Sequence, residues 1–229
     1  MKILAIGAHP DDIEIFMYGL LAACKKRGDE IISVVATDGA AGNYIQNKDL
    51  KKTRMKESKI GLKNISKPIF LDLEDGNLSG SHNAKKIVYQ CIDKHNPDLI
   101  ITHDVNDYHS DHRALSEIII ESSGYRYPVL LSDTLMGVNF NPEFYVDITD
   151  HINEKHQAIM AHKSQNPIMF SEAAKLMNRF RSAQCNGPEN HYAEAYKTVK
   201  KFPIVNIGSM LPPSPKLRKF YNINSDGFL

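Results

Sequence analysis

Two clusters of imidazole and carboxylate side chains stand out as residues that could do chemistry. The first is the run His9-Pro10-Asp11-Asp12, with Glu14 close behind it. The second runs from His103 to His112 and includes four further acidic or imidazole residues: Asp104, Asp107, His109 and Asp111. Carboxylates and imidazoles crowded in a crevice are costly to bury unless a cation compensates them. The two clusters together therefore predict a metal site.

His9, Asp12 and His112 would supply two nitrogens and one oxygen, with a fourth position left for water, as expected for a catalytic zinc site. We expect one Zn²⁺ per chain, although another divalent metal would suit the same ligands. The competing interpretation is that His9 and His112 are ordinary loop histidines, because short motifs often match by chance.

Asp11 is expected to act as the general base. Successive side chains diverge at a turn, so Asp11 would not share the ion with Asp12 and could face the water at the open position. The alternative is a structural one, in which Asp11 caps the helix that starts near Ile13.

His109, three residues before His112, is expected to stabilise the oxyanion or, as an imidazolium, to protonate a leaving amine. Asp111 or Asp107 could hold His109 in that state, and the sequence does not decide which of the two does so. We assign Asp111 to the catalytic group and Asp107 to the candidate substrate-binding group.

Both clusters follow short apolar runs that are typical of strands buried on both faces of a parallel sheet. The four predicted strands are Ile3–Ile6, Ile31–Ala36, Pro68–Leu73 and Leu99–Ile101. They alternate with apolar patterns of helical period over 13–24, 84–95 and 113–122, and with a charged surface helix predicted over 51–62. Later segments predict strands at 129–131 and 144–146 and helices at 148–164 and 171–183. This order predicts an α/β fold, a Rossmann-like and mainly parallel sheet with helices on both faces.

In such a sheet the active site lies at the carboxyl ends of the strands, which is where both clusters fall. The dinucleotide fingerprint needs three glycines after the first strand, whereas this chain has Gly7 followed by His-Pro-Asp-Asp. We therefore expect no nucleotide cofactor.

The composition narrows the class of protein further. The 229 residues carry 28 Lys+Arg against 27 Asp+Glu, a net charge of +1, which does not favour a nucleic acid partner. The three cysteines form no CxxC pair, and no stretch approaches the roughly 20 apolar residues of a membrane span. We expect a cytoplasmic protein with one domain over 1–229, whose Pro-rich tail beyond about residue 203 is a candidate arm to a neighbouring subunit.

The sequence resembles the LmbE-like, or PIG-L, zinc-dependent N-acetylglucosamine de-N-acetylases. The motifs that carry the resemblance are Ala8–Asp12 with Glu14, Thr37 with Gly39–Gly42, Arg54 with Glu57, Thr102–Ala114, His162–Gln165 and Tyr192–Tyr196. Ala40 departs from the family pattern, which usually has an acid there, so any sugar contact made at that position is in doubt. The resemblance ends near Tyr196.

The resemblance implies a hydrolase that removes acetyl from an N-acetylated amino sugar, with zinc on His9, Asp12 and His112 and with Asp11 as the base. It also implies that Arg54 reaches the sugar or an anionic group attached to it; the alternative from spacing is a surface ion pair with Glu57. Tyr192 is the candidate tyrosine that assists the oxyanion, with Tyr108 and Tyr44 as alternatives. The family further suggests a trimer or hexamer.

The substrate could be a glucosaminyl conjugate, a nucleotide sugar or a glycan precursor. Two other functions compete. A two-metal phosphoesterase would need Asp11, Asp107 or His103 as additional ligands, which would remove the base. A non-catalytic zinc- or sugar-binding module would not need Asp11 at all.

Overall fold

The computed structural model describes residues 1–42, 49–200 and 207–215. Its centre is a seven-stranded sheet with the order β3-β2-β1-β4-β5-β7-β6, in which β1 to β5 pair in parallel and β7 is antiparallel to both neighbours. The strands are β1 (Lys2–Gly7), β2 (Glu30–Thr37), β3 (Ile69–Leu73), β4 (Leu99–Thr102), β5 (Val129–Ser132), β6 (Phe144–Asp147) and β7 (Ala193–Thr198). The mainly parallel sheet expected from the sequence is confirmed.

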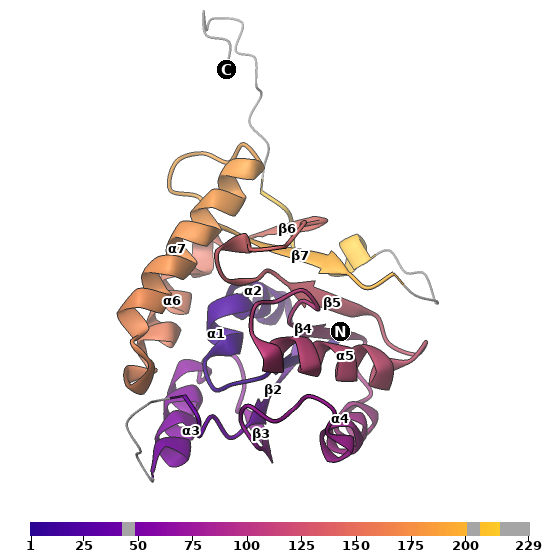
Figure 1. The fold of residues 1–229 in the computed structure, drawn as a ribbon. Helices are drawn as coiled ribbons and strands as arrows, with labels where there is room; N and C mark the ends of the chain where they lie inside the picture. The colour runs from indigo at the N-terminus through magenta and orange to yellow at the C-terminus, as the bar shows by residue number, and fades with distance from the viewer. Residues whose placement is uncertain (43–48, 201–206, 216–229) are drawn as a thin grey trace, which may run out of the picture.

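Helices cover both faces of the sheet (Figure 1). They are α1 (Asp12–Phe16), α2 (Tyr18–Arg27), α3 (Leu50–Gly61), α4 (His82–His95), α5 (Ser110–Ser123), α6 (Ile152–Met160) and α7 (Pro167–Gln184). Helices α4 and α5 pack together over one face, while α1, α2, α6 and α7 share the core of the other. Short 3₁₀ turns are found at Leu135–Gly137, Thr149–His151, Lys163–Gln165 and Ile207–Met210.

The central strand β1 shows why the apolar runs fold as they do. Ile3 and Ala5 belong to the core on one face, and Leu4 and Ile6 belong to the core on the other. All four side chains are fully buried. A strand covered on both faces must be apolar at every position, which accounts for a continuous run rather than an alternating one.

The strand order reverses between β1 and β4, because β2 and β3 lie on one side of β1 whereas β4 and β5 lie on the other. The connections that leave neighbouring strands at such a point diverge to opposite faces and open a crevice at their carboxyl ends. The His9–Asp12 turn follows β1, and the segment from His103 to His112 follows β4. The sheet topology therefore brings the two clusters together.

The predicted helix over 13–24 is interrupted at Met17, where α1 ends and α2 begins. The amide groups of Gly19 and Leu20 donate to the two carboxylate oxygens of Glu194, at 2.9 and 2.8 Å. Glu194 lies on β7, 174 residues further along the chain than Leu20. The new helix start is thus capped by a residue that local sequence cannot supply.

Two other expectations about elements need correction. The helix predicted over 148–164 is shorter, since α6 begins at Ile152 and ends at Met160, with a 3₁₀ turn on either side. Strand β7 was not predicted, because its residues AEAYKT carry little apolar or β-branched pattern.

The described part of the tail packs on its own chain. Ile207 is buried, and Met210 and Leu211 pack against the core of the α1 face. The Pro213 carbonyl accepts a hydrogen bond from the Asp147 amide at 3.1 Å. The role of subunit arm stays a prediction, and residues 201–206 and 216–229 of the tail lie outside the described residues. None of the helices in the described ranges is long and apolar enough to cross a membrane.

Candidate active site

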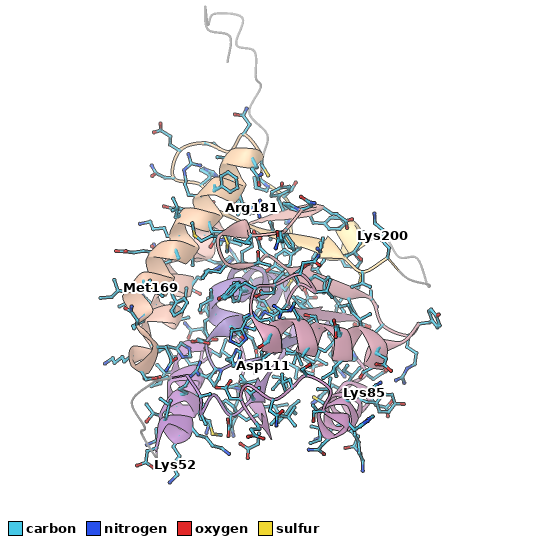
Figure 2. The ribbon with its side chains drawn as sticks, viewed as in Figure 1. Lys52, Lys85, Asp111, Met169, Arg181 and Lys200 are labelled. Atoms are coloured by element: carbon cyan, nitrogen blue, oxygen red, sulfur yellow. The ribbon has the colours of Figure 1, made fainter. Side chains whose placement is uncertain are left out.

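The two polar clusters open into one cavity of about 370 Å³ at the carboxyl ends of β1 and β4. Its walls come from the His9–Asp12 turn, from α1 and from the start of α5, and also from segments far apart in sequence: Ala41, Gly42, Arg54, Asp75, Gly76, Gln165 and Phe170. Asp111 is buried and is labelled near the middle of the view in Figure 2, whereas Lys52 and Lys200 lie at the periphery.

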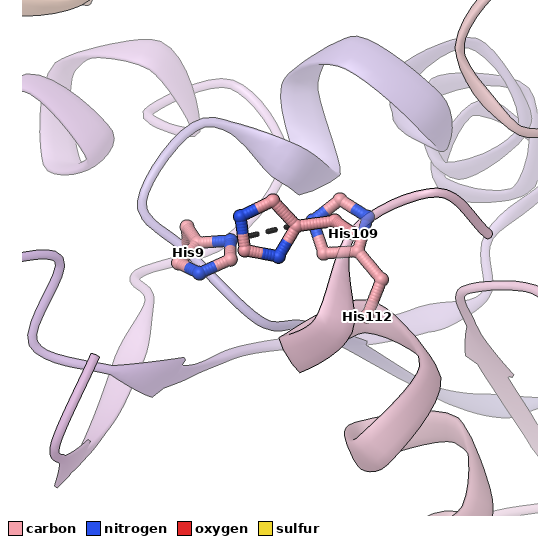
Figure 3. A group of neighbouring side chains, drawn as sticks. All are labelled: His9, His109 and His112. Atoms are coloured by element: carbon pink, nitrogen blue, oxygen red, sulfur yellow. Dashed lines mark hydrogen bonds between the residues drawn. The ribbon is translucent and has the colours of Figure 1, made fainter. Parts of the chain in front are cut away.

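The side chains of His9, Asp12 and His112 converge at one end of the cavity. His9 Nδ1 lies 3.3 Å from His112 Nε2 and 3.4 Å from Asp12 Oδ2, and His112 Nε2 lies 3.2 Å from Asp12 Oδ1. Figure 3 shows His9 and His112 facing each other beside His109. A tetrahedral zinc ion with bonds of about 2.0–2.1 Å separates its ligand atoms by roughly 3.3 Å. The separations in the structure are close to this value, with Asp12 presenting a different oxygen to each imidazole.

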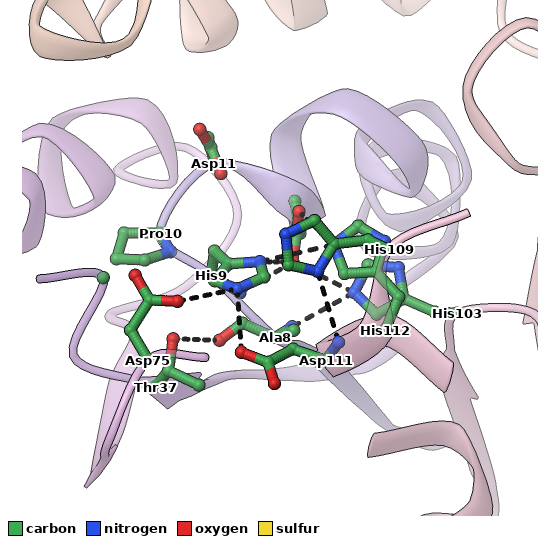
Figure 4. A network of polar contacts seen from close by, with 12 residues as sticks. Ala8, His9, Pro10, Asp11, Thr37, Asp75, His103, His109, Asp111 and His112 are labelled. Atoms are coloured by element: carbon green, nitrogen blue, oxygen red, sulfur yellow. Dashed lines mark hydrogen bonds and ion pairs between the residues drawn. The ribbon is translucent and has the colours of Figure 1, made fainter. Parts of the chain in front are cut away.

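The other ring nitrogen of each imidazole faces a carboxylate. His9 Nε2 lies 3.2 Å from Asp75 Oδ1 and 3.4 Å from Asp111 Oδ2, on the side away from His112 (Figure 4). His112 Nδ1 lies 3.2 Å from Asp107 Oδ2. A carboxylate behind a histidine holds the proton on that nitrogen and leaves the lone pair of the other nitrogen free for a metal. Both imidazoles are thus oriented toward the same point.

The pKa values of His9, Asp12 and His112 are shifted by the charged groups that face them. Burial opposes the charged form of His112, but Asp12 and Asp107 outweigh it and raise its pKa to about 9. Burial is likewise outweighed at His9, where contacts with Asp111 and Asp12 hold the pKa well above its usual value. His112 and His103 hold the pKa of Asp12 well below its usual range against the effect of burial. The carboxylates around the two imidazoles therefore favour positive charge at this point.

His109 has a different environment from the other two imidazoles. Its Nδ1 accepts a hydrogen bond from the Asp111 amide at 3.2 Å, which also caps α5. That bond leaves the proton of a neutral ring on Nε2. Burial lowers the pKa of His109, and the neighbouring His9 and His112 lower it further.

Asp111 and Asp107, the two acids expected to charge His109, instead face His9 and His112. The imidazolium form is therefore not favoured, and the geometry suits a neutral hydrogen-bond donor at Nε2. Asp107 is 2% exposed and lies behind His112 rather than among the described residues that line the cavity, which does not suit a substrate contact.

Asp11 lines the cavity without joining the group of His9, Asp12 and His112. Both of its carboxylate oxygens accept from Arg54 Nη2 at 3.2 Å. Its φ of 143° lies in a region that favours glycine, a strained geometry of the kind that persists where surrounding contacts impose it. Asp11 makes no capping hydrogen bond to the described residues of α1, so the capping alternative is wrong.

The pKa of Asp11 is raised by burial, although Arg54 opposes the shift. A carboxylate of raised pKa is a better proton acceptor near neutral pH than an ordinary one.

Arg54 is buried and donates to the carbonyl oxygens of Gly39 and Pro10 as well as to Asp11. The surface ion pair with Glu57 is not formed, because Glu57 accepts two hydrogen bonds from Ser164. Arg54 therefore reaches the cavity wall, as the family resemblance implied, but its charge is already balanced by a carboxylate.

Tyr192 packs against the core on the α1 face, and its backbone bonds to Ile148 and Thr149. Among the described residues it is Tyr108, not Tyr192, that lines the cavity. Tyr44 lies outside the described residues.

Two functional candidates were not assigned a role from the sequence. Asp75 lies in the loop after β3, and its only sequence signal is that this loop also leaves the carboxyl end of a parallel strand. His103 Nε2 lies 3.0 Å from Asp12 Oδ2 and 3.1 Å from the Ala8 amide, which donates to it. Its ring is fully buried and stacks on His112 with 3.7 Å between centroids. His103 therefore holds the Asp12 carboxylate through a hydrogen bond and the His112 ring through stacking.

Comparison with known proteins identifies the class. The family model PIG-L, described as GlcNAc-PI de-N-acetylase, matches residues 4–123, more than half of the 229 residues. The chain belongs to this family of de-N-acetylases, and its fold is the LmbE-like fold. It is a hydrolase of amide bonds in N-acetylated sugars.

Two of the individual relatives are deacetylases, and a third protein shares the fold. The diacetylchitobiose deacetylase of Thermococcus kodakarensis is 27% identical over 191 residues, 72% of this chain and 70% of that protein. The N,N'-diacetylchitobiose deacetylase of Pyrococcus horikoshii, solved with its inhibitor MPG, has a TM-score of 0.76 at 26% identity and covers 86% of this chain and 83% of its own. The 4-carboxy-2-hydroxymuconate hydratase GalB of Pseudomonas putida has a TM-score of 0.77 at 18% identity, over 90% of this chain and 98% of its own, which shows a shared fold alone.

Proposed function

We propose that this chain is a zinc-dependent hydrolase that removes the acetyl group from an N-acetylated amino sugar, with His9, Asp12 and His112 as the protein ligands of one zinc ion. The observation that supports this most directly is the convergence of these three side chains: His9 Nδ1 lies 3.3 Å from His112 Nε2, while Asp12 presents Oδ2 to His9 at 3.4 Å and Oδ1 to His112 at 3.2 Å. Carboxylates behind both imidazoles keep the free lone pairs directed at one point.

Zinc bound at this point would act as a Lewis acid and lower the pKa of water toward ~7. Asp11 accepts the proton as water attacks the acetyl carbon, and it returns that proton to the amine nitrogen as the C–N bond breaks. Its raised pKa suits both steps. Arg54 fixes the orientation of the Asp11 carboxylate by bonding to both oxygens. The His109 Nε2–H donates to the oxyanion as it forms.

The charges of the cavity favour a neutral sugar over an anionic conjugate. Among the described lining residues Arg54 is the one arginine or lysine, and its Nη2 is paired with Asp11 while its Nη1 lies 4.0 Å from Asp75. A phosphate or carboxylate on the substrate would find no uncompensated guanidinium there and would meet Asp75 instead. The diacetylchitobiose deacetylases among the relatives act, by their names, on an uncharged disaccharide.

The two competing functions are less well supported. A second metal ion would need Asp11, Asp107 or His103 as additional ligands. Arg54 holds Asp11, Asp107 faces His112 Nδ1, and His103 is buried behind Asp12. A pure binding module would not need a strained, buried carboxylate beside the three converging side chains.

The test is acetate release from a panel of N-acetylated saccharides, nucleotide sugars and acidic conjugates, with and without chelator. We expect release from neutral saccharides that depends on zinc. Asp11→Ala should lower kcat by about 10²- to 10⁴-fold with one zinc per chain retained, and Glu117→Ala, at an exposed position of α5, is the control for substitution on a helix that borders the cavity. Normal acetate release by the Asp11 variant, or two zinc ions per chain, would refute this proposal.

A further inference from the structure

The segment His162–Gln165 joins α6 to α7 and reaches the cavity only at its last residue. Neither the metal site nor the base uses it. Its side chains nevertheless make several of the buried polar contacts around the cavity, and they do so with two acidic residues of α1 and α3 that have no assigned role: Glu14 and Glu57.

The first contact fixes the start of the segment. His162 Nε2 lies 2.8 Å from Glu14 Oε1, and neither side chain is more than 1% exposed. Burial opposes the charged form of His162, but Glu14 outweighs it and raises the pKa of the imidazole. Glu14 occupies the second position after Asp12. The segment is thus attached to the same helix that begins at the metal site.

The second contact fixes the middle of the segment. The Ser164 amide donates to Glu57 Oε1 at 2.9 Å, and the Ser164 hydroxyl donates to Glu57 Oε2 at 2.6 Å. Glu57 and Arg54 stand three residues apart on α3 and so share a face of this helix. One helix therefore holds Asp11 through Arg54 and holds the 162–165 segment through Glu57.

These contacts place Gln165 on the cavity wall beside Gly42 and Arg54. Its amide nitrogen donates to the carbonyl and the hydroxyl oxygen of Ser164, at 3.0 and 3.2 Å. The carbonyl oxygen Oε1 is then the end that faces Gly42, where an added Cβ would lie 2.9 Å from it. The side-chain amide of Gln165 is therefore held in place before any ligand binds. Its carbonyl oxygen is an acceptor on the same side of the cavity as Arg54.

We propose that Gln165 is a specificity-determining residue that accepts a hydrogen bond from one hydroxyl group of the amino sugar, and that Glu57 positions it through Ser164. This inference rests on the proposed function and names the contact that would recognise the sugar rather than its acetyl group. A neutral amide acceptor suits a hydroxyl group, because it selects for a donor without adding charge to a cavity that is already acidic.

The test compares Gln165→Ala with the wild-type enzyme on methyl N-acetylglucosaminide and on its 3-, 4- and 6-deoxy analogues. We expect KM for the parent glycoside to rise about 3- to 10-fold in the variant with kcat within about twofold, since one neutral hydrogen bond is lost. For the one analogue that lacks the recognised hydroxyl, wild type and variant should give the same KM. Lys163→Ala, an exposed neighbour in the same segment, is the matched control and should change neither constant.

Glu57 is tested as a positioning residue. Glu57→Ala should reproduce the KM effect of Gln165→Ala, the double variant should add little to it, and Glu57→Gln, which keeps an acceptor for the Ser164 amide, should recover part of the loss. An equal loss on all four glycosides, or no loss on any, overturns the role of Gln165.

Failure of the proposed function looks different, because the wild-type enzyme would then release no acetate from any glycoside. In that case the role of Gln165 is tested by calorimetry, which measures the Kd of the methyl glycoside for the wild-type protein and for Gln165→Ala. A Kd raised about 3- to 10-fold in Gln165→Ala would support the contact, whereas equal Kd values, or no binding by either chain, would overturn it.

Discussion

A substitution of Asp107 distinguishes two roles for this residue, a contact with the substrate and a contact with His112. The sequence suggested a contact with substrate, whereas the structure places its carboxylate 3.2 Å from His112 Nδ1. Asp107 Oδ1 also accepts from the His109 amide at 2.8 Å. Asp107→Asn keeps an acceptor for that amide but places an NH₂ group opposite a ring nitrogen that carries a proton.

Two donors cannot face each other, so the His112 ring must move its proton to Nε2, the nitrogen proposed to bind zinc. Loss of a carboxylate behind a metal-bound histidine costs about 10- to 100-fold in metal affinity or activity. On the scale of 1.4 kcal/mol per tenfold change, this corresponds to about 1.4 to 2.8 kcal/mol of zinc binding free energy.

The assay is competition for zinc with a chromogenic chelator at pH 7.5, followed by KM and kcat at saturating zinc. We expect weaker zinc binding and an unchanged KM. Asp93→Asn, which alters a half-exposed surface pair with Arg126, is the matched control and should leave zinc affinity unchanged. Unchanged zinc affinity together with a raised KM in the Asp107 variant would show that the carboxylate touches substrate and that the interpretation from the structure is wrong.

Three further changes test other parts of the molecule. Asp12→Ala should lose zinc as well as activity, because it removes one of three proposed protein ligands, and full zinc by elemental analysis would exclude that assignment. Lys155→Met should lower the free energy of unfolding in urea by about 3–5 kcal/mol, since it leaves Glu194 buried without its cation, whereas Lys26→Met in an exposed pair should change it by less than ~1 kcal/mol. The raised pKa of His162 means that its pairing with Glu14 stabilises the folded state fully below pH ~6.5 and less as the pH rises through the folded pKa. Wild-type protein should therefore lose more stability than His162→Gln between pH 6 and pH 9, and parallel stability curves would contradict this.

Local pattern predicted the parallel half of the fold well. Strands β1, β2, β3 and β4 were each located to within about two residues, because a strand covered on both faces leaves a continuous apolar run in the sequence. The antiparallel edge was harder to predict. Strand β7 buries Glu194 and two alanines, and neither residue type marks a strand.

The break between α1 and α2 could not be predicted for a related reason. Its cap is the carboxylate of Glu194, which reaches the helix start from another strand and is itself neutralised by Lys155. The same Tyr-Ala-Glu motif had suggested a tyrosine at the oxyanion. A motif shared with a family shows that residues matter, but not whether they matter for chemistry or for packing.

The sequence by itself determined which residue types stand after the first and fourth predicted strands, and the strand pattern was enough to place both clusters at one edge of a sheet. Only the tertiary structure decided how the acids pair with the imidazoles. Asp75, Asp107 and Asp111 are similar in sequence context, and which ring nitrogen each one faces depends on the packing of α5 against β4 and on the loop after β3. Charge and spacing along a chain predict that a site exists, whereas the division of roles within it follows from distances of about 3 Å that are set by contacts between remote segments.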